Sequence, residues 1–465
     1  MSNVVPGAGP GRRTAQGRRF AVNLTTVLAV LLPLLTVGVL ALVRSEEPTV
    51  SAHDPVQTAL TSSLLVCPTA EPGARTVYAS TAEKDASGKV TIGPGESQEP
   101  LPVLAGRVAT YDAGVGAVLV HGAGDLAPGL VAARFTAKPV ASNLCAPPAA
   151  DQWFTGVGAG AGHRSVLELT NPDRGPAIVD VTLYGRAGTI DVPALRGVSV
   201  AGLDTVRVDL ATTIPRRDEL AIRVTSARGR VAASVLDSFD ELGAGASASD
   251  QLLAQPAPVT SNVLMGVTGG AGRQTLVLAN SGADEVRANV RVVTEDSVFA
   301  PRGVEEIRVP PESVKRVSLS RVLQETDGVL GVVVDSTGPV TATLRSFVGG
   351  DLSHAVAGEA VSSPTTVVLP TGSKQLLLSG ADKVGVVTVV AHTAGGKELV
   401  SRRIELNPGR GAAVDLPEGA TLLTVTPDGT SVIGAVLVQG RGSTVVPLRE
   451  LVRTGLIPDV RPGTP

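Results

Sequence analysis

The chain has 465 residues, with 40 basic and 43 acidic side chains and a formal net charge of -3, so it lacks the positive excess typical of nucleic-acid-binding proteins. Its length allows three or four domains. Aromatic residues make up only 2% of the sequence, which leaves few of the exposed rings on which sugar ligands commonly stack.

The N-terminal segment predicts a single membrane-spanning helix. Residues 1–19 carry four arginines and no acid, and an almost wholly apolar run follows over residues 20–43. As a helix this run spans about 36 Å, more than a hydrocarbon core of about 30 Å. The positive-inside rule makes residues 1–19 a cytoplasmic tail. We therefore expect a plasma-membrane protein whose bulk is extracytoplasmic. A cleaved signal peptide is the alternative.

Two cysteines, Cys67 and Cys145, predict a disulfide. They lie 78 positions apart, in similar settings, within the part of the chain expected outside the cytoplasm, where disulfides persist. The alternative is a pair of buried thiols packed as small hydrophobic groups. Two cysteines without an accompanying His or Cys motif do not make a four-ligand zinc site, and we expect neither a metal nor a cofactor.

Beyond residue 59 the sequence predicts antiparallel β-structure. Short runs rich in Val, Leu, Ile and Thr are broken by Gly, Pro, Asp and Asn roughly every 8–12 residues, as in β-sandwiches or β-barrels. Residues 179–184 alternate apolar and polar side chains, which indicates a strand with one buried face. The expected fold class is all-β, with an N-terminal transmembrane helix followed by tandem immunoglobulin-like β-sandwich units.

The chain also repeats itself at a constant offset of 109 residues. This shift superposes Leu169 on Leu278 and Asn171 on Asn280, and a weaker, shortened third copy follows. Each copy has the length of one sandwich. We predict a linker at 44–59, a β domain with the disulfide at 60–150, β-sandwich repeats at 151–256, 257–360 and 361–452, and a tail at 453–465.

Two Gly-rich segments at equivalent positions of the first two copies form a speculative ligand loop. Open backbone amides beside a cation suit an anion or a sugar hydroxyl. The alternative is a strand-entry loop with a solvated charge. A dinucleotide site is disfavoured because a strand-like segment follows where a helix is needed. The candidate residues are Gly158, Gly160 and Arg164 in one copy and Gly269, Gly270 and Arg273 in the next.

No residue pattern predicts catalysis. The five histidines are scattered, and we expect structural or solvent-facing roles for them. The acidic cluster Asp237, Asp240 and Glu241 is expected on a solvated face or turn rather than as a glycosidase pair. Trp153 and Phe154 are expected in core or interdomain packing. We therefore predict that the protein is not an enzyme.

The order of these features resembles a known family. The basic tail and apolar run are followed by Cys67-Pro68, by Cys145 with Trp153-Phe154, and by strand pairs such as residues 169–172 and 181–185. This is similar to an uncharacterised actinobacterial family of membrane-anchored secreted proteins, a domain of unknown function often found beside an envelope glycosyltransferase. The resemblance implies no functional residue.

Together these observations predict a membrane-anchored, extracytoplasmic and non-catalytic cell-envelope protein that acts as a scaffold or interaction module. The alternative is a glycan-binding accessory protein to an envelope glycosyltransferase. The expected partners are the membrane, through a single-pass anchor, and envelope proteins or glycans, but no nucleic acid.

Overall fold

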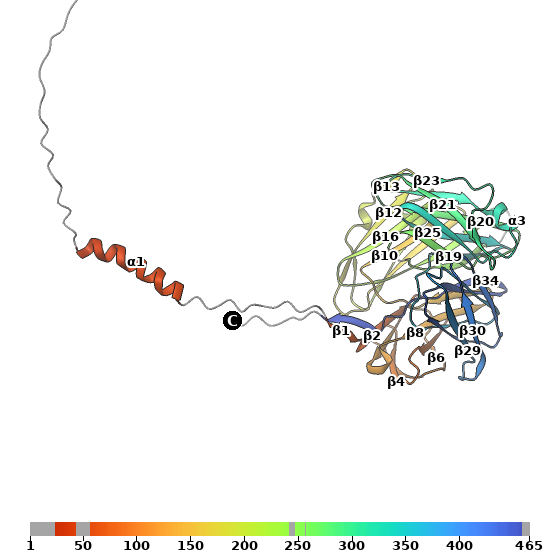
Figure 1. The fold of residues 1–465 in the computed structure, drawn as a ribbon, viewed down its shortest axis with the longest axis horizontal. Coiled ribbons are helices and arrows are strands. Elements are labelled where there is room, and N and C mark those ends of the chain that lie inside the picture. The colour runs from red at the N-terminus through yellow and green to blue at the C-terminus, as the bar shows by residue number, and fades with distance from the viewer. Residues whose placement is uncertain (1–23, 43–55, 241–246, 256, 458–465) are drawn as a thin grey trace, which may run out of the picture. The chain divides into compact units, whose positions relative to one another are not determined.

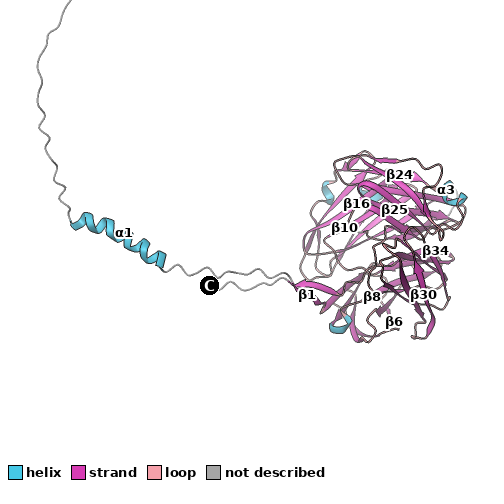
Figure 2. Cartoon of the chain, in the orientation of Figure 1, coloured by secondary structure: helices cyan, strands magenta, loops and turns pink. Residues whose placement is uncertain are grey.

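Antiparallel strands dominate the fold, as the alternation of apolar and polar residues predicts (Figure 2). The computed structural model describes residues 24–42, 56–240, 247–255 and 257–457. The predicted cytoplasmic tail lies outside the described residues, as do most of the predicted linker and the end of the predicted C-terminal tail.

The N-terminal helix α1 runs from Leu24 to Leu42 and contains Pro33. Its 19 residues make a helix of about 28 Å, shorter than the expected run and slightly shorter than a hydrocarbon core of about 30 Å. Among the described helices, none is long and apolar enough to cross a membrane. The prediction of a transmembrane helix at 20–43, and with it the single-pass plasma-membrane localisation, is therefore wrong.

Residues Gln57–Leu456 form a compact unit of their own, built from four successive strand groups. The first group has two four-stranded antiparallel sheets over one shared core, with strand orders β2-β7-β4-β5 and β6-β3-β8-β9. Its strands are β2 (Ser62–Cys67), β3 (Thr76–Thr81), β4 (Ser87–Gly93), β5 (Glu99–Leu104), β6 (Ala109–Asp112), β7 (Val118–Ala123), β8 (Leu130–Ala137) and β9 (Val140–Leu144), with the 3-10 turn η1 (Gly124–Leu126) after β7.

The second group is a nine-stranded sheet in which β13-β12-β16-β10-β11-β17-β18 form the path, while β14 pairs with β12 and β15 with β11. Its elements are β10 (Asp151–Gly160), β11 (His163–Thr170), β12 (Ala177–Gly185), β13 (Gly188–Ile190), η2 (Pro193–Leu195), β14 (Val198–Val200), β15 (Thr205–Asp209), α2 (Leu210–Thr213), β16 (Arg217–Arg228), β17 (Ala232–Asp240) and β18 (Ser247–Leu252).

The third group is arranged around one long strand, β25, which pairs with β19, β20, β21 and β26, while β22 and β23 pair with β21 and β24 pairs with β20. Its elements are β19 (Val259–Met265), β20 (Gly272–Asn280), β21 (Val286–Val293), β22 (Val298–Phe299), β23 (Ile307–Val309), β24 (Ser313–Ser318), α3 (Ser320–Glu325), β25 (Gly331–Val348) and β26 (Asp351–Val356).

The fourth group again has two four-stranded sheets, ordered β27-β32-β29-β30 and β31-β28-β33-β34. Its strands are β27 (Thr365–Val368), β28 (Ser373–Ser379), β29 (Gly385–His392), β30 (Glu398–Leu406), β31 (Ala412–Leu416), β32 (Leu422–Asp428), β33 (Ile433–Gly440) and β34 (Gly442–Pro447).

The last strand of each group packs against the last strands of its neighbours, so that β9, β18, β26 and β34 form a closed cycle. Hydrogen bonds cross the seams: Ser142 Oγ lies 3.0 Å from Thr444 Oγ1, and His354 N donates to Asp250 Oδ2 at 3.2 Å. The groups are thus four blades of a β-propeller-like arrangement (Figure 1).

The ring corrects the predicted row of tandem immunoglobulin-like sandwiches, although the all-β content is confirmed. The physical reason is that the alternation of apolar and polar side chains predicts which segments are strands and which face of each strand is buried. It does not predict which other part of the chain packs against the second face of a sheet. Here the last strands bury their polar side chains against one another. A short pair, β1 (Val56–Ala59) with β35 (Thr454–Ile457), joins two segments that were expected in the linker and the tail.

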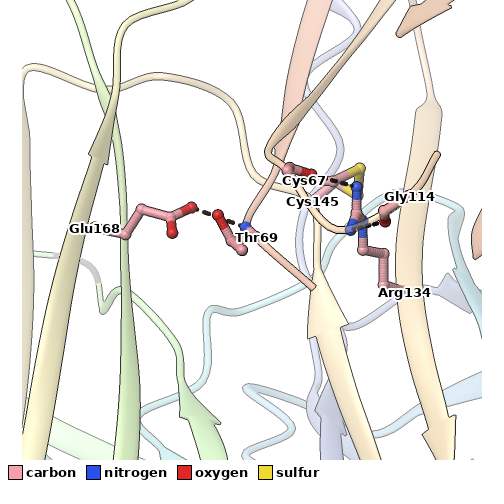
Figure 3. The surroundings of a disulfide bond; sticks show 7 residues. Cys67, Thr69, Gly114, Arg134, Cys145 and Glu168 are labelled. Atoms are coloured by element: carbon pink, nitrogen blue, oxygen red, sulfur yellow. Dashed lines mark hydrogen bonds between the residues drawn. A yellow bond between two sulfur atoms is a disulfide. The ribbon is translucent and has the colours of Figure 1, made fainter. Parts of the chain in front are cut away.

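The predicted disulfide between Cys67 and Cys145 is confirmed. It joins the end of β2 to the segment after β9, beside the fully buried Arg134 (Figure 3). Nearby, Thr69 N donates to Glu168 Oε1 at 2.8 Å, which ties the first blade to the second. The disulfide therefore fixes the C-terminal end of the first blade, at the place where this blade contacts the second.

Replacing both cysteines by alanine is expected to lower the free energy of unfolding by about 4 kcal/mol, because the 78-residue loop is then no longer closed in the unfolded chain. Urea denaturation of the oxidised wild type and of the double variant measures this difference. In a reducing buffer the two proteins should become nearly equal. Equal stability under oxidising conditions would contradict the prediction.

Candidate functional site

An open cavity of about 610 Å³ lies between the second and third blades. Its wall comes from β11, β16 and β17 on one side and from β20, β24 and β25 on the other. The cavity is within the size range of ligand pockets, and its lining is unusually rich in charge. The residues that carry its chemistry are His163, Asp218, Glu219, Asp240, Arg273, Arg316 and Arg345, with Phe239 and Phe347.

Arg345 of β25 links the two blades at the base of this cavity. Its Nη2 donates to Glu219 Oε1 at 2.6 Å, and its Nη1 donates to the Gly156 carbonyl at 3.2 Å. Both partners of the ion pair are buried. Arg316 Nη1 lies 3.6 Å from the same Glu219 oxygen. Glu219 has a φ of 50°, a conformation rare outside glycine, so the backbone is strained where it presents this carboxylate.

Arg273 of β20 lies over two phenyl rings at the cavity wall. Its guanidinium carbon is 4.6 Å from the centre of the Phe239 ring and 5.4 Å from that of Phe347. The two ring centres are 5.1 Å apart. Such cation–π contacts fix the plane of the guanidinium against the two rings.

Behind the cavity, a chain of buried side chains leads to the centre of the ring. Asp237 accepts from His163 Nε2 at 2.9 Å, from His354 Nε2 at 3.0 Å and from Ser165 Oγ at 2.5 Å. His354 Nδ1 in turn lies 3.3 Å from Asp250 Oδ2. All these groups are buried. Two histidines that are far apart in the sequence therefore share one carboxylate.

The side chains in this buried series have pKa values that depart from the ordinary ones. Burial by itself lowers the pKa of His354, but its hydrogen bonds to Asp237 and Asp250 outweigh burial and raise it to about 9. Burial acts to raise the pKa of Asp237, yet the two histidines together hold it well below its usual range. Burial raises the pKa of Asp250, and it raises that of Asp351 to about 6.

The structure places the six residues of the predicted ligand loop in different surroundings. Gly158 and Gly160 lie within β10 rather than in a loop, which corrects that expectation. A Cβ on Gly158 would lie 2.3 Å from His163 Nδ1, and one on Gly160 would lie 2.5 Å from Asp218 Oδ1. These glycines therefore make room for cavity side chains. Gly269 and Gly270 do lie in a loop, before β20.

The two predicted arginines occupy equivalent positions but have different partners. Arg164 Nε donates to Asp209 Oδ1 at 3.2 Å, and its side chain is largely exposed outside the cavity. The position 109 residues after Asp209 is Ser318, which cannot form this ion pair. Arg273 lies instead against the rings of the cavity wall. Only the second arginine therefore belongs to the cavity.

Several residues of the site were not singled out from the sequence. Arg345, Glu219, Phe239 and Phe347 carried no motif, and Asp237, expected on a solvated face or turn, is fully buried. The available signal was a charged residue within a largely apolar segment, since Arg345 lies inside the buried run of β25. Trp153 and Phe154 are both buried, as expected.

Comparison with known proteins gives a match to one family model, described as a family of unknown function (DUF5719), over residues 108–417. No curated protein matches the chain.

Replacing His354 by glutamine is expected to remove a pH dependence of stability. A histidine whose pKa rises on folding, here from 6.5 to about 9, stabilises the fold fully below pH 6.5 and loses this effect as the pH rises through about 9. The wild type should lose up to about 3 kcal/mol of unfolding free energy over this range. Asp351, with a pKa of about 6, titrates below this pH range. Urea unfolding at several pH values measures the loss.

His121, which is only partly buried, provides the matched control for this experiment. Its ring bonds Ser62 Oγ at the surface, so His121→Gln should keep the wild-type pH profile. A His354→Gln variant with an unchanged profile would contradict the assignment.

Proposed function

The chain belongs to this family of unknown function, and we propose that it is a non-catalytic binding protein that holds an acidic glycan in the cavity between its second and third blades. The observation that carries the proposal is the stacked arrangement of Arg273 on Phe239 and Phe347 in the wall of that cavity. It combines a cation for a carboxylate with rings for the apolar face of a sugar.

The remaining lining suits the rest of such a ligand. Asp218 and Asp240 accept hydrogen bonds from sugar hydroxyls, while the hydroxyl groups of Thr275, Ser318 and Ser320 both donate and accept. Arg345 pairs with Glu219 at 2.6 Å, and Arg316 Nη1 lies 3.6 Å from the same carboxylate. We assign the acidic group of the ligand to Arg273 because of its position over the two rings. The scarcity of aromatic residues in the sequence does not count against this site, since two phenylalanines gather in it.

The surroundings of His163 support a binding role over a catalytic one. Its Nε2 bonds Asp237, and its Nδ1 lies 3.3 Å from Arg345 Nη1 and faces Gly158. A general base needs a ring nitrogen within hydrogen-bond reach of the substrate. With both nitrogens directed at the protein, His163 is a structural residue of the cavity wall.

The sequence predicted first a cell-envelope scaffold or interaction module, which stays a prediction. The cavity favours the alternative, a glycan-binding accessory protein. We extend the proposal to the context implied by the family resemblance, an actinobacterial cell envelope in which a glycosyltransferase makes or uses the bound glycan.

Calorimetric titration of the full chain with a uronic-acid oligosaccharide tests the proposal. Arg273→Ala should weaken binding at least about tenfold, because a charge-assisted hydrogen bond contributes about 1.5–3 kcal/mol. Arg164→Ala is the matched control, since it removes the equivalent arginine of the preceding blade, and it should leave the affinity within about twofold of the wild type.

A neutral hexose oligomer of equal length completes the design and should bind more weakly than the acidic one. A flat titration with the acidic oligosaccharide, or equal losses in the two arginine variants, would exclude this cavity as the site.

A further inference from the structure

A second pocket, of about 420 Å³, lies between the first and fourth blades. Its wall is mainly aliphatic and comes from β2, β8, β27 and the segment after β34. Leu64, Leu130, Val367 and Val452 are among its lining residues, and the side chain of Val452 is strongly exposed. A pocket of this size with apolar walls suits a small apolar ligand.

Two of the four charged residues of this lining, Arg230 and Glu450, are held by hydrogen bonds. Arg230 binds Asp173 through two hydrogen bonds of 2.9 and 3.0 Å. Glu450 accepts from Ser362 N at 2.8 Å and from the hydroxyl of Ser363. These side chains are therefore occupied in holding the surrounding segments and contribute little to ligand recognition.

Arg449 differs from them. Within the described residues its guanidinium makes one hydrogen bond, from Nη2 to the Ala254 carbonyl at 3.1 Å, although it has five N–H donors. Burial lowers its pKa, which Glu359 opposes only through space, since the two side chains do not form an ion pair. Arg449 is half-buried, and a partly desolvated cation with spare donors at the edge of an apolar pocket is stabilised by an anion.

We propose that this pocket binds a fatty acid, with the acyl chain along the aliphatic wall and the carboxylate on Arg449. The site is separate from the glycan cavity, because the two share no lining residue. The argument for this occupant is charge complementarity: one incompletely bonded cation beside an apolar wall matches one carboxylate on an apolar chain.

Calorimetric titration of the full chain with decanoate and with decanol tests the proposal without any variant. Decanoate should bind with one-to-one stoichiometry and about tenfold more tightly than decanol, since only the acid places a charge on Arg449. No binding of either compound would overturn the proposal. Equal binding of the two would overturn the role given to Arg449.

Variants then locate the site. Arg449→Met should weaken decanoate binding about tenfold, whereas Arg403→Met, at an exposed position on β30, should leave it unchanged. Val131→Trp places a large ring in the pocket and should abolish binding. Full binding by Val131→Trp would overturn the location. A dimer of the chain that decanoate does not dissociate would assign the surface to a second copy and overturn the proposal as well.

Discussion

The buried carboxylate of Asp237 is the point on which the centre of the molecule depends. An unpaired charge in such a place costs several kcal/mol, so its three hydrogen bonds, from His163, His354 and Ser165, are obligatory rather than incidental. Because His354 belongs to the third blade and the other groups to the second, satisfying this one side chain also sets the distance between the two blades. The width of the cavity next to Asp237 therefore depends on this distance.

The interfaces between blades differ in character, and this determines where open space remains between them. Between the third and fourth blades a large part of the contact is apolar, with Met265 and Val333 packed against Leu377 and Leu437. Such a contact closes tightly. Between the second and third blades, part of the contact is built from charged side chains that need exact partners, and space is left beside Arg345. Both pockets discussed above lie at joints between blades rather than inside a blade core.

The sequence was sufficient to predict the strand content, the disulfide and the burial of Trp153 and Phe154, because these depend on local alternation and on residue type. It could not predict the ring, which depends on contacts between segments far apart in the sequence, such as Ser142 and Thr444, which are 302 positions apart. The residues of the site were also only partly predictable. Arg273 was identified because Arg164 occupies the equivalent position. Phe239 and Arg345 were missed because the residues 109 positions away are Val348 and Leu236, so comparison of the copies gave no signal for them.

The pairing of β1 with β35 has a consequence for how such a chain can evolve. A row of independent sandwiches gains or loses a copy with little effect on the others. In this arrangement every blade contacts two neighbours, and a strand before the first blade pairs with a strand after the fourth. Adding a fifth copy would separate those two strands and change the angle at every joint. The closed cycle of blades therefore constrains the number of copies, whereas a row of independent sandwiches would not.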